Sequence, residues 1–357
     1  MADEKLDRRS FVKGSLVLGL SAATAALAGC ATPEQPASDG TRDGSVNDEV
    51  PVEPATPAAP SSAPSERGAG FSLEGSTPGA AKVYATADLS AEGLLKVYEA
   101  LGWQPEGNVG IKLHMGEDGN PYYLHPALLQ LLVESVGGTF VDSTVLYGRR
   151  STADGYAALA RENGFTYAPV DILDADGGMI LPVEGGSRLT EAEVGSHFAD
   201  YQSLISVAHF KGHGMAGFGG TFKNLAIGLA TVSGKMAVHT SAFETGAPFV
   251  ERVAEFAKGV FDAMGPHMAC INVLNNLSVD CDCDGNPEAP AMGDIGIMAS
   301  LDPVALDQAS VDQIYLSADP GRQAVIDRIE SRDGGHLLDY AEQLGVGSKA
   351  YELVVLD

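Results

Sequence analysis

Two cysteines alternate with three aspartates in a short loop of the second half of the chain. The run is Asp280-Cys281-Asp282-Cys283-Asp284, followed by a glycine, and it offers thiol and carboxylate ligands to a metal ion. Thiols suit zinc or iron, whereas Asp-x-Asp-x-Asp-Gly is the opening of a calcium loop. The twelfth position of such a loop is Ala291 rather than Glu, so the pattern favours zinc or iron and leaves calcium open. The alternative is an acidic surface loop with inert thiols.

The cysteine count also favours a metal. Apart from Cys30, the chain has Cys270, Cys281 and Cys283. One disulfide would leave a free thiol, and a Cys-x-Cys disulfide closes a strained ring. Three thiols are too few for a conventional 4Fe-4S cluster, which needs four ligands. We therefore expect a bound metal ion rather than a disulfide framework or a conventional cluster.

A glycine-rich segment, residues 209–224, carries the second set of candidates. His209, Lys211 and His213 alternate at a strand end, and we predict them as catalytic residues; His209 or His213 could also complete the metal shell. Five glycines would let backbone amides approach an anionic group such as a carboxylate or phosphate. The cofactor-binding residues predicted in this segment are Gly217, Gly219, Gly220, Lys223 and Asn224. The alternative is a flexible loop whose histidines end a strand.

A third loop, residues 110–120, places Lys112 and His114 on one face of a predicted strand, directly before a glycine-rich turn. We predict both as cofactor-binding residues, and the alternative is an edge strand with solvated polar side chains. Asp302 is predicted to cap the helix that Pro303 begins, while Asp307 is left unassigned. Three other histidines are isolated in the sequence and are expected to be structural: His125, His239 and His336.

The first residues of the chain resemble an export signal. Arg8 and Arg9 stand before Phe11 and Lys13, as in a twin-arginine signal, and an uncharged run rich in small residues follows. The run ends in Leu-Ala-Gly before Cys30, a lipobox whose cysteine would carry lipid. We predict a signal over 1–29, export by the twin-arginine translocase, and anchoring through Cys30 to the outer face of the cytoplasmic membrane or the cell envelope. The alternative is an uncleaved anchor helix.

Composition divides the rest of the chain into a tether and a domain. Residues 30–77 are rich in Pro, Ala and Ser with few large apolar side chains, so we predict a disordered tether there and a folded domain over 78–357. The formal net charge is −26 and no basic stripe is present, which argues against nucleic acid as a partner. The acidity would favour cationic ligands or metals.

Short apolar runs alternate with helical patterns through the predicted domain. Strands are expected over 82–86, 108–114, 139–143, 168–172, 179–183, 203–210, 268–277, 295–299 and 351–356. Helices are expected over 90–101, 125–136, 151–163, from 222, and over 246–264, 303–315, 321–330 and 336–344. The alternation predicts a single large α/β domain with a mostly parallel sheet and helices on both faces. Ligands of such sheets bind at the carboxyl ends of the strands, where the three loops fall.

Three segments resemble the DUF362 family, some of whose members are labelled iron–sulfur centre proteins. They are IKLHMGEDGN, HFKGHGMAGFGGTFKNL and DCDCDGNPEAPAMGDIGIMASLDPVALDQA, and the resemblance runs from about Lys82 to Tyr340. Many relatives carry a ferredoxin-like module with Cys-x-x-Cys-x-x-Cys spacing, which this sequence lacks. The resemblance implies one α/β domain with a metal or cofactor site, and it implies no particular reaction.

Two functions follow from these patterns. One is a metal-dependent enzyme, of the redox class for example, that acts on an anionic small molecule at the cell envelope. The other is a lipid-anchored protein that binds a metal or an anionic ligand without turnover. An electron-carrying subunit is disfavoured because a four-cysteine cluster cannot be built.

Overall fold

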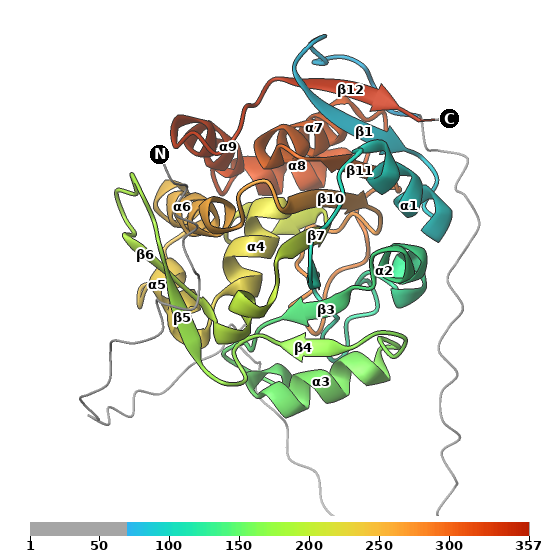
Figure 1. Ribbon diagram of the computed structural model, residues 1–357. Helices are drawn as coiled ribbons and strands as arrows, with labels where there is room; N and C mark the ends of the chain where they lie inside the picture. Colours follow the sequence, from blue (N-terminus) through green and yellow to red (C-terminus); the bar gives the residue numbers. More distant parts are fainter. Residues whose placement is uncertain (1–69, 357) are drawn as a thin grey trace, which may run out of the picture. The chain divides into compact units, whose positions relative to one another are not determined.

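The computed structural model describes residues 70–356, all of which belong to one compact unit (Figure 1). Its centre is an eight-stranded sheet with the strand order β12-β1-β11-β10-β7-β2-β3-β4. Only β11 runs antiparallel to its neighbours, and all other pairs in this sheet are parallel. The predicted α/β class with a mostly parallel sheet is therefore confirmed.

The strands of the central sheet are β1 (Ala81–Thr86), β2 (Val109–Lys112), β3 (Thr139–Asp142), β4 (Val170–Ile172), β7 (Ser203–His209), β10 (Met268–Leu274), β11 (Gly296–Ser300) and β12 (Tyr351–Val355). The α-helices are α1 (Ala91–Ala100), α2 (Gln130–Val136), α3 (Ala153–Glu162), α4 (Thr221–Leu229), α5 (Val232–His239), α6 (Ala247–Met264), α7 (Pro303–Leu316), α8 (Arg322–Glu330) and α9 (Gly334–Gln343). Within residues 70–356 the 3-10 helices are η2 (Pro126–Leu129), η3 (Arg149–Ser151) and η4 (Ser196–Asp200).

Two apolar cores lie on the two faces of the sheet. Strand alternation divides β7 between them, since Ile205 and Val207 belong to one core and Leu204 to the other. Helices α1, α2 and α3 supply the first core, which includes Leu94 and Tyr156. Helices α4 to α9 supply the second core. Helices therefore cover both faces, as the sequence predicts.

Local signals set several helix boundaries. Ser90 caps α1 by accepting a hydrogen bond from the Gly93 amide, and Asp302 caps α7 by accepting from Val304 and Ala305. Helix α2 ends at Gly137, whose φ of 63° is in the left-handed region that glycine adopts without strain. The structural role predicted for Asp302 is thus confirmed.

Some elements differ from the prediction. The glycine-rich segment forms a small hairpin of β8 (Lys211–His213) and β9 (Gly217–Gly219), and a second hairpin joins β5 (Gly178–Pro182) to β6 (Glu191–Gly195). The sequence gives no clear strand signal for β6, β8 or β9, because short, glycine-rich or charged strands lack the apolar alternation of longer ones. Helix α5 was also not expected.

The predicted export signal and Cys30 lie outside the described residues, as does the tether up to residue 69. Residues 71–77, predicted as part of the tether, contact the domain. Gln313 exchanges two hydrogen bonds with the Ser72 backbone, and the Thr77 amide donates to the Tyr351 carbonyl. The domain therefore begins closer to Phe71, which packs against the second core. None of the helices between residues 70 and 356 is long and apolar enough to cross a membrane.

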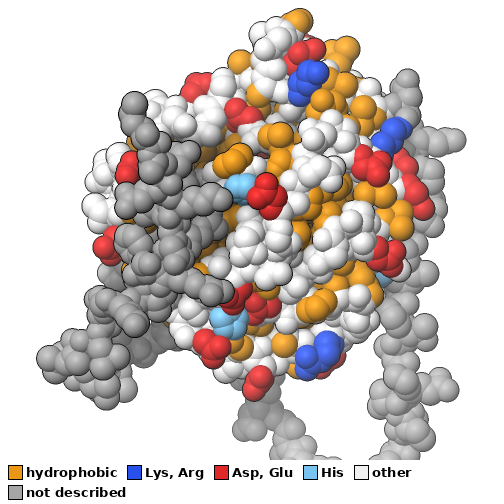
Figure 2. Space-filling model, viewed as in Figure 1, with side chains coloured by type: hydrophobic (Ala, Val, Ile, Leu, Met, Phe, Trp, Pro, Cys, Tyr) orange, Lys and Arg blue, Asp and Glu red, His pale blue; other side chains and the backbone are white. Residues whose placement is uncertain are grey.

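The surface carries the negative charge of the chain. On the face drawn in Figure 2, Asp and Glu side chains are spread widely, while Lys and Arg gather at only a few places. Several cationic side chains are instead buried, among them Lys112, Lys211, Lys235 and Arg150. Each buried charge needs a partner, and these partners surround the site described next.

Candidate functional site

The three predicted loops meet at the carboxyl ends of three neighbouring strands. Lys112 ends β2, His209 ends β7, and the cysteine loop follows β10, which ends at Leu274. These three strands are adjacent and parallel in the sheet, so their carboxyl ends lie side by side. Ligands of open α/β sheets bind at such carboxyl ends of the strands.

Two thiols and one imidazole lie close together near these strand ends. The sulfur atoms of Cys281 and Cys283 and a ring nitrogen of His213 all lie within 4.8 Å of one another. Thiol and imidazole are the donor set of many zinc and iron sites. Cys270 is separate from this group: it is buried in the second core, where burial raises the pKa of its thiol well above the usual value.

Asp282 anchors the cysteine loop between its two thiols. Its carboxylate is buried, lies 2.8 Å from the His209 Nδ1 atom and accepts a hydrogen bond from the Lys211 ammonium at 2.7 Å. Although burial opposes ionisation, the charges of His209 and Lys211 lower the pKa of Asp282. Residues 281–284 form a turn, which a hydrogen bond from the Asp284 amide to the Cys281 carbonyl closes at 3.0 Å, and Asp282 anchors this turn to His209 and Lys211.

This contact gives His209 and Lys211 a defined place. The His209 Nε2 atom also lies 2.6 Å from the Asn275 carbonyl oxygen, so both ring nitrogens face acceptors. The ring therefore has no lone pair directed at the thiols. Of the three residues predicted as catalytic, His209 and Lys211 hold Asp282, and only His213 reaches the two thiols.

Side chains from other loops support the backbone of the cysteine loop. The Asn120 amide donates to the Asp284 carbonyl at 2.9 Å and to the Cys281 carbonyl at 3.4 Å. The Tyr147 hydroxyl donates to the Cys283 carbonyl at 3.1 Å. Neither residue was predicted, because long-range contacts to backbone carbonyls leave no local pattern in the sequence.

The cysteine pair has one thiol that ionises easily. A hydrogen bond with Cys283, opposed by burial and aided by His213 and Lys223, lowers the pKa of Cys281 well below its usual value. The same sulfur–sulfur contact and burial raise the pKa of Cys283. The Lys223 ammonium forms no hydrogen bond or ion pair within residues 70–356, so its charge acts on Cys281 without a fixed partner.

The carboxylates of the cysteine loop do not gather around one point. Asp280 accepts from the Glu288 amide and faces Arg328 at 3.8 Å, while Asp284 accepts from the Asn286 amide. Asp282 turns inward to His209. The calcium alternative needs several of these oxygens around one ion, and in the described structure the carboxylates make separate local contacts instead.

His114 presents a buried donor without an acceptor. Its Nδ1 atom accepts a hydrogen bond from the Gly116 amide at 3.1 Å, so in the neutral ring the proton resides on Nε2. That Nε2 atom is buried and has no hydrogen-bond partner within the described residues. Burial, together with the positive charge of Arg150, lowers the pKa of His114 well below 6.5 and keeps the ring neutral. A buried donor of this kind calls for an acceptor.

Lys112 and Asn224, both predicted to bind a cofactor, contact each other. The Lys112 ammonium lies 3.2 Å from Asp142 and 2.9 Å from the Asn224 oxygen. The Asn224 amide donates to the Lys112 carbonyl and to the Ser206 hydroxyl. Burial lowers the pKa of Lys112, and Asp142 offsets part of that effect. These contacts join α4 to β2 and β7 below the site.

Two buried cations nearby escaped prediction. Arg150 pairs with Glu117 through Nε at 2.7 Å, and its guanidinium lies 5.2 Å from the centre of the Tyr156 ring. Lys235 donates to the Ser143 hydroxyl at 2.7 Å, and burial lowers the pKa of its ammonium to about 7. Arg150 follows another arginine and Lys235 is a lone basic side chain in its segment, and neither pattern predicts a buried cation.

Different structural constraints act on the three glycines that were predicted to bind a cofactor. Gly217 has a φ of +84° and lies against the α8–α9 turn, where a Cβ atom would be 2.8 Å from the Ile329 carbonyl. A Cβ atom on Gly220 would be 2.6 Å from the Asp307 carboxylate. Gly219 alone of the three has open space beside it. Close packing therefore accounts for Gly217 and Gly220 without a ligand.

Asp307 holds the start of α4. Its carboxylate accepts from the Thr221 and Phe222 amides and from Asn272, and burial raises its pKa to about 6. The three isolated histidines also have local contacts. His125 accepts from Ala127, the ring of His239 lies 2.8 Å from the Lys235 carbonyl, and His336 lies 2.9 Å from Glu251.

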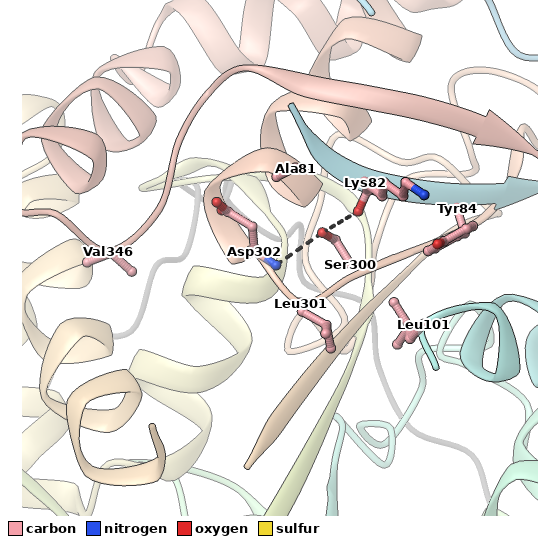
Figure 3. Close-up of a pocket in the computed structure, with 8 residues that line it drawn as sticks. All are labelled: Ala81, Lys82, Tyr84, Leu101, Ser300, Leu301, Asp302 and Val346. Atoms are coloured by element: carbon pink, nitrogen blue, oxygen red, sulfur yellow. Dashed lines mark hydrogen bonds between the residues drawn. The ribbon is translucent and has the colours of Figure 1, made fainter. Parts of the chain in front are cut away.

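A pocket of about 420 Å³ lies at the opposite ends of the strands, near the start of β1 and the end of β11 (Figure 3). The Ser300 hydroxyl donates there to the Lys82 carbonyl and accepts from the Asp302 amide. Leu101, Leu301 and Val346 line the same pocket, and no histidine or cysteine does. Its polar side chains are those of Lys82, Tyr84, Ser300 and Asp302, so it lacks the thiol and imidazole groups that lie together near the cysteine loop.

Comparison with known proteins identifies the family. Residues 109–312, more than half of the chain, match the model described as "Domain of unknown function (DUF362)", and the chain belongs to this family. No curated protein matches it significantly. The lactate racemase apoprotein from Thermoanaerobacterium thermosaccharolyticum is similar in structure, with 17% identity over 59% of this chain and 52% of that chain, and a TM-score of 0.34. A structural-genomics protein from Thermotoga maritima shows 14% identity over 51% and 49%, with a TM-score of 0.33. The chain thus spans about half the length of each.

Proposed function

We propose that this DUF362 protein binds a soft metal ion, zinc or iron, through the thiolates of Cys281 and Cys283. The carrying observation is the approach of both sulfur atoms and the His213 ring within 4.8 Å. Thiolates are preferred ligands of zinc and iron, and an ion held by few protein ligands keeps positions for other molecules. Such an ion would supply Lewis-acid or redox chemistry. The residues fit a metal because Cys281 ionises easily and Lys223 offsets negative charge nearby.

We further propose that the site takes an anionic small molecule beside the metal. The supporting observation is the buried Nε2 donor of His114, which lacks an acceptor within residues 70–356. A carboxylate or phosphate oxygen would satisfy it, and the free ammonium of Lys223 would add a favourable charge. Lys112 and Lys211 contribute less to such binding, since each already pairs with an aspartate.

The test is metal analysis of the full chain purified without chelator, together with an absorption spectrum. We expect one equivalent of metal in the wild-type protein and none in the Cys281→Ser, Cys283→Ser double variant, with the fold retained. Cys270→Ala is the matched control, because it removes a thiol that lies in the core. Metal-free wild-type protein whose thermal stability does not change on adding zinc, iron or calcium would refute the metal proposal.

Turnover distinguishes the two functional classes. An enzyme, redox or hydrolytic, needs an exchangeable position on the metal, whereas a closed tetrahedral shell indicates a structural site. The alternative is a non-catalytic protein that binds a metal or an anion. The buried orphan donor of His114 favours a site that accepts a second molecule, because a closed structural site has no use for it.

The proposed place of action is outside the cytoplasm. The twin-arginine pattern at Arg8 and Arg9 and the lipobox at Cys30 support export by the twin-arginine translocase and anchoring by lipid. Folding before export would load the metal where Cys281 and Cys283 stay reduced. The anchored protein would meet small anions or metals at the membrane surface through a tether, with no role for nucleic acid.

A further inference from the structure

The proton on the His213 ring is fixed by the backbone around it. The Nδ1 atom accepts hydrogen bonds from the Met215 amide at 3.2 Å and the Ala216 amide at 3.0 Å. An amide N–H can only donate, so Nδ1 must present its lone pair to these two groups. In a neutral imidazole the single proton is then on Nε2. The ring nitrogen without a backbone partner, Nε2, is then an N–H donor rather than a lone pair.

A metal ligand needs the opposite arrangement. An imidazole that binds a metal uses the lone pair of one nitrogen and usually donates its other N–H to a carbonyl or carboxylate. His239 shows what that would look like, since its Nδ1 lies 2.8 Å from the Lys235 carbonyl and leaves a lone pair on Nε2. His239 is not a member of the close group of Cys281, Cys283 and His213.

The local fold keeps the His213 ring in this state. His213 pairs with Gly217 across the hairpin of β8 and β9, and the side chain is only 6% exposed. Gly212 lies so close to the next loop that a Cβ atom there would be 2.6 Å from Val279. Moving the proton to Nδ1, which would free the Nε2 lone pair for a metal, would leave both backbone amides without their acceptor.

We propose that His213 is a positioning residue that donates its Nε2–H to the Cys281 sulfur, so that the chain supplies two metal ligands, the thiolates of Cys281 and Cys283. The proposal rests on the proposed function, namely that a soft metal binds here. Hydrogen bonds to ligating sulfur hold the ligand in place and tune the metal. A four-coordinate ion then keeps two positions for atoms from a bound small molecule or water.

A metal held by only two protein ligands leaves room for a bound anion, and an oxygen of that anion would be an acceptor for the unpaired Nε2–H group of His114. His114 and His213 share the same tautomer, since each Nδ1 atom accepts a backbone amide two residues further along. Both therefore present N–H groups and neither presents a lone pair. An oxygen of the bound anion could accept from His114 while the Cys281 sulfur accepts from His213.

The test uses the full chain labelled with nitrogen-15 histidine and loaded with cadmium-113, a soft ion that NMR detects directly. We expect scalar coupling from cadmium to the β protons of Cys281 and Cys283 and none to the ring of His213, which keeps its Nε2 proton. This measurement needs no substitution, so it does not depend on a variant that folds.

Affinity measurements on variants give an independent readout. His213→Gln keeps an N–H donor without an imidazole lone pair, and His213→Ala removes the donor. We expect His213→Gln to bind cadmium within about threefold of the wild-type affinity and His213→Ala to bind about 10- to 100-fold more weakly, the usual loss for an outer hydrogen bond. His125→Gln is the control, because His125 accepts a similar local amide bond in an exposed position.

Two outcomes overturn the proposal, and each has its own meaning. Coupling from cadmium to the His213 ring, or a loss in His213→Gln as large as that in Cys281→Ser, would make His213 a ligand and leave the metal function standing. Wild-type protein that binds no cadmium, or unchanged binding in the Cys281→Ser, Cys283→Ser variant, would remove the proposed function and this inference with it.

Discussion

The substitution Gly228→Ala is expected to destabilise the protein, although helix propensity alone predicts the reverse. Gly228 lies inside α4, where alanine is usually more stable than glycine by about 1 kcal/mol. A Cβ atom at this position, however, would lie 2.2 Å from both the Cε and the Nζ atom of Lys112. The sign of the effect therefore tells whether the contact with Lys112 is as close as the structure shows.

Lys112 has little freedom to move away. Its side chain is 1% exposed, and its ammonium is held by Asp142 at 3.2 Å and by Asn224 at 2.9 Å. Overpacking a buried site costs about 1–3 kcal/mol, and losing a buried ion pair costs about 3–5 kcal/mol. With partial loss of the pair and the propensity gain subtracted, we expect a net loss of about 2–3 kcal/mol in the free energy of unfolding.

Urea unfolding followed by circular dichroism measures this change, provided that the slope stays constant. Gly335→Ala in α9 is the matched control, because its Cβ atom would meet nothing within 4 Å, and we expect it to be neutral or stabilising. Lys112→Leu lacks the two atoms that the new methyl group meets. In that background Gly228→Ala should lose most of its cost, which gives a coupling energy for the pair.

A stabilised Gly228→Ala variant, or an equal loss with and without the lysine, would refute this reasoning. The first result would mean that α4 sits further from β2 than described. The second would mean that the new methyl group disturbs some other contact. Either outcome would also remove the argument that Asp142 and Asn224 occupy Lys112 and leave it unavailable to a ligand.

Three further predictions concern other parts of the chain. Hydrogen bonds to Asp171 and Asp176 raise the pKa of His197 above 6.5, so the protonated ring should stabilise the fold below pH 6.5 and lose this effect as the pH rises through its folded pKa. His197→Gln should therefore flatten this part of a plot of melting temperature against pH. A plot that is the same for both proteins would contradict the prediction. Asn120→Ala should weaken zinc binding about 10- to 100-fold because the cysteine loop loses its support, whereas wild-type affinity would show that the loop holds itself. Arg8→Lys with Arg9→Lys should leave the precursor in the cytoplasm by fractionation, and continued export would exclude the twin-arginine route.

Much of the fold could be predicted because its strands follow strong rules. The run from Ser203 to Phe210 is mostly apolar, and buried parallel strands have this composition. Ser90, Asp302 and Gly137 mark helix ends by their own chemistry. The hairpin of β8 and β9 was missed because its glycines mimic a loop, and its pairing depends on contacts with α8 and the residues after β10.

The site was harder to predict, since the alternation of His209, Lys211 and His213 is interrupted between two sheets. β7 ends at His209 and β8 starts at Lys211, so the three side chains do not share one strand face. His209 and Lys211 meet Asp282, whereas His213 meets the thiols. The distinction depends on where residues 278–283 lie, which is a tertiary contact that no local spacing encodes.

The strongly acidic chain leaves few cationic groups free for the proposed anion. Lys112 pairs with Asp142, Lys211 with Asp282, and Arg150 with Glu117, so these cations mainly compensate buried carboxylates. Buried charges left without such partners would be costly, and the pairs therefore explain the cluster of cations without a ligand. What the pairs do not explain are the free ammonium of Lys223 and the buried donor of His114. Under the proposed function, any anion bound beside the cysteine pair would therefore be recognised chiefly by these two groups, together with the proposed metal ion.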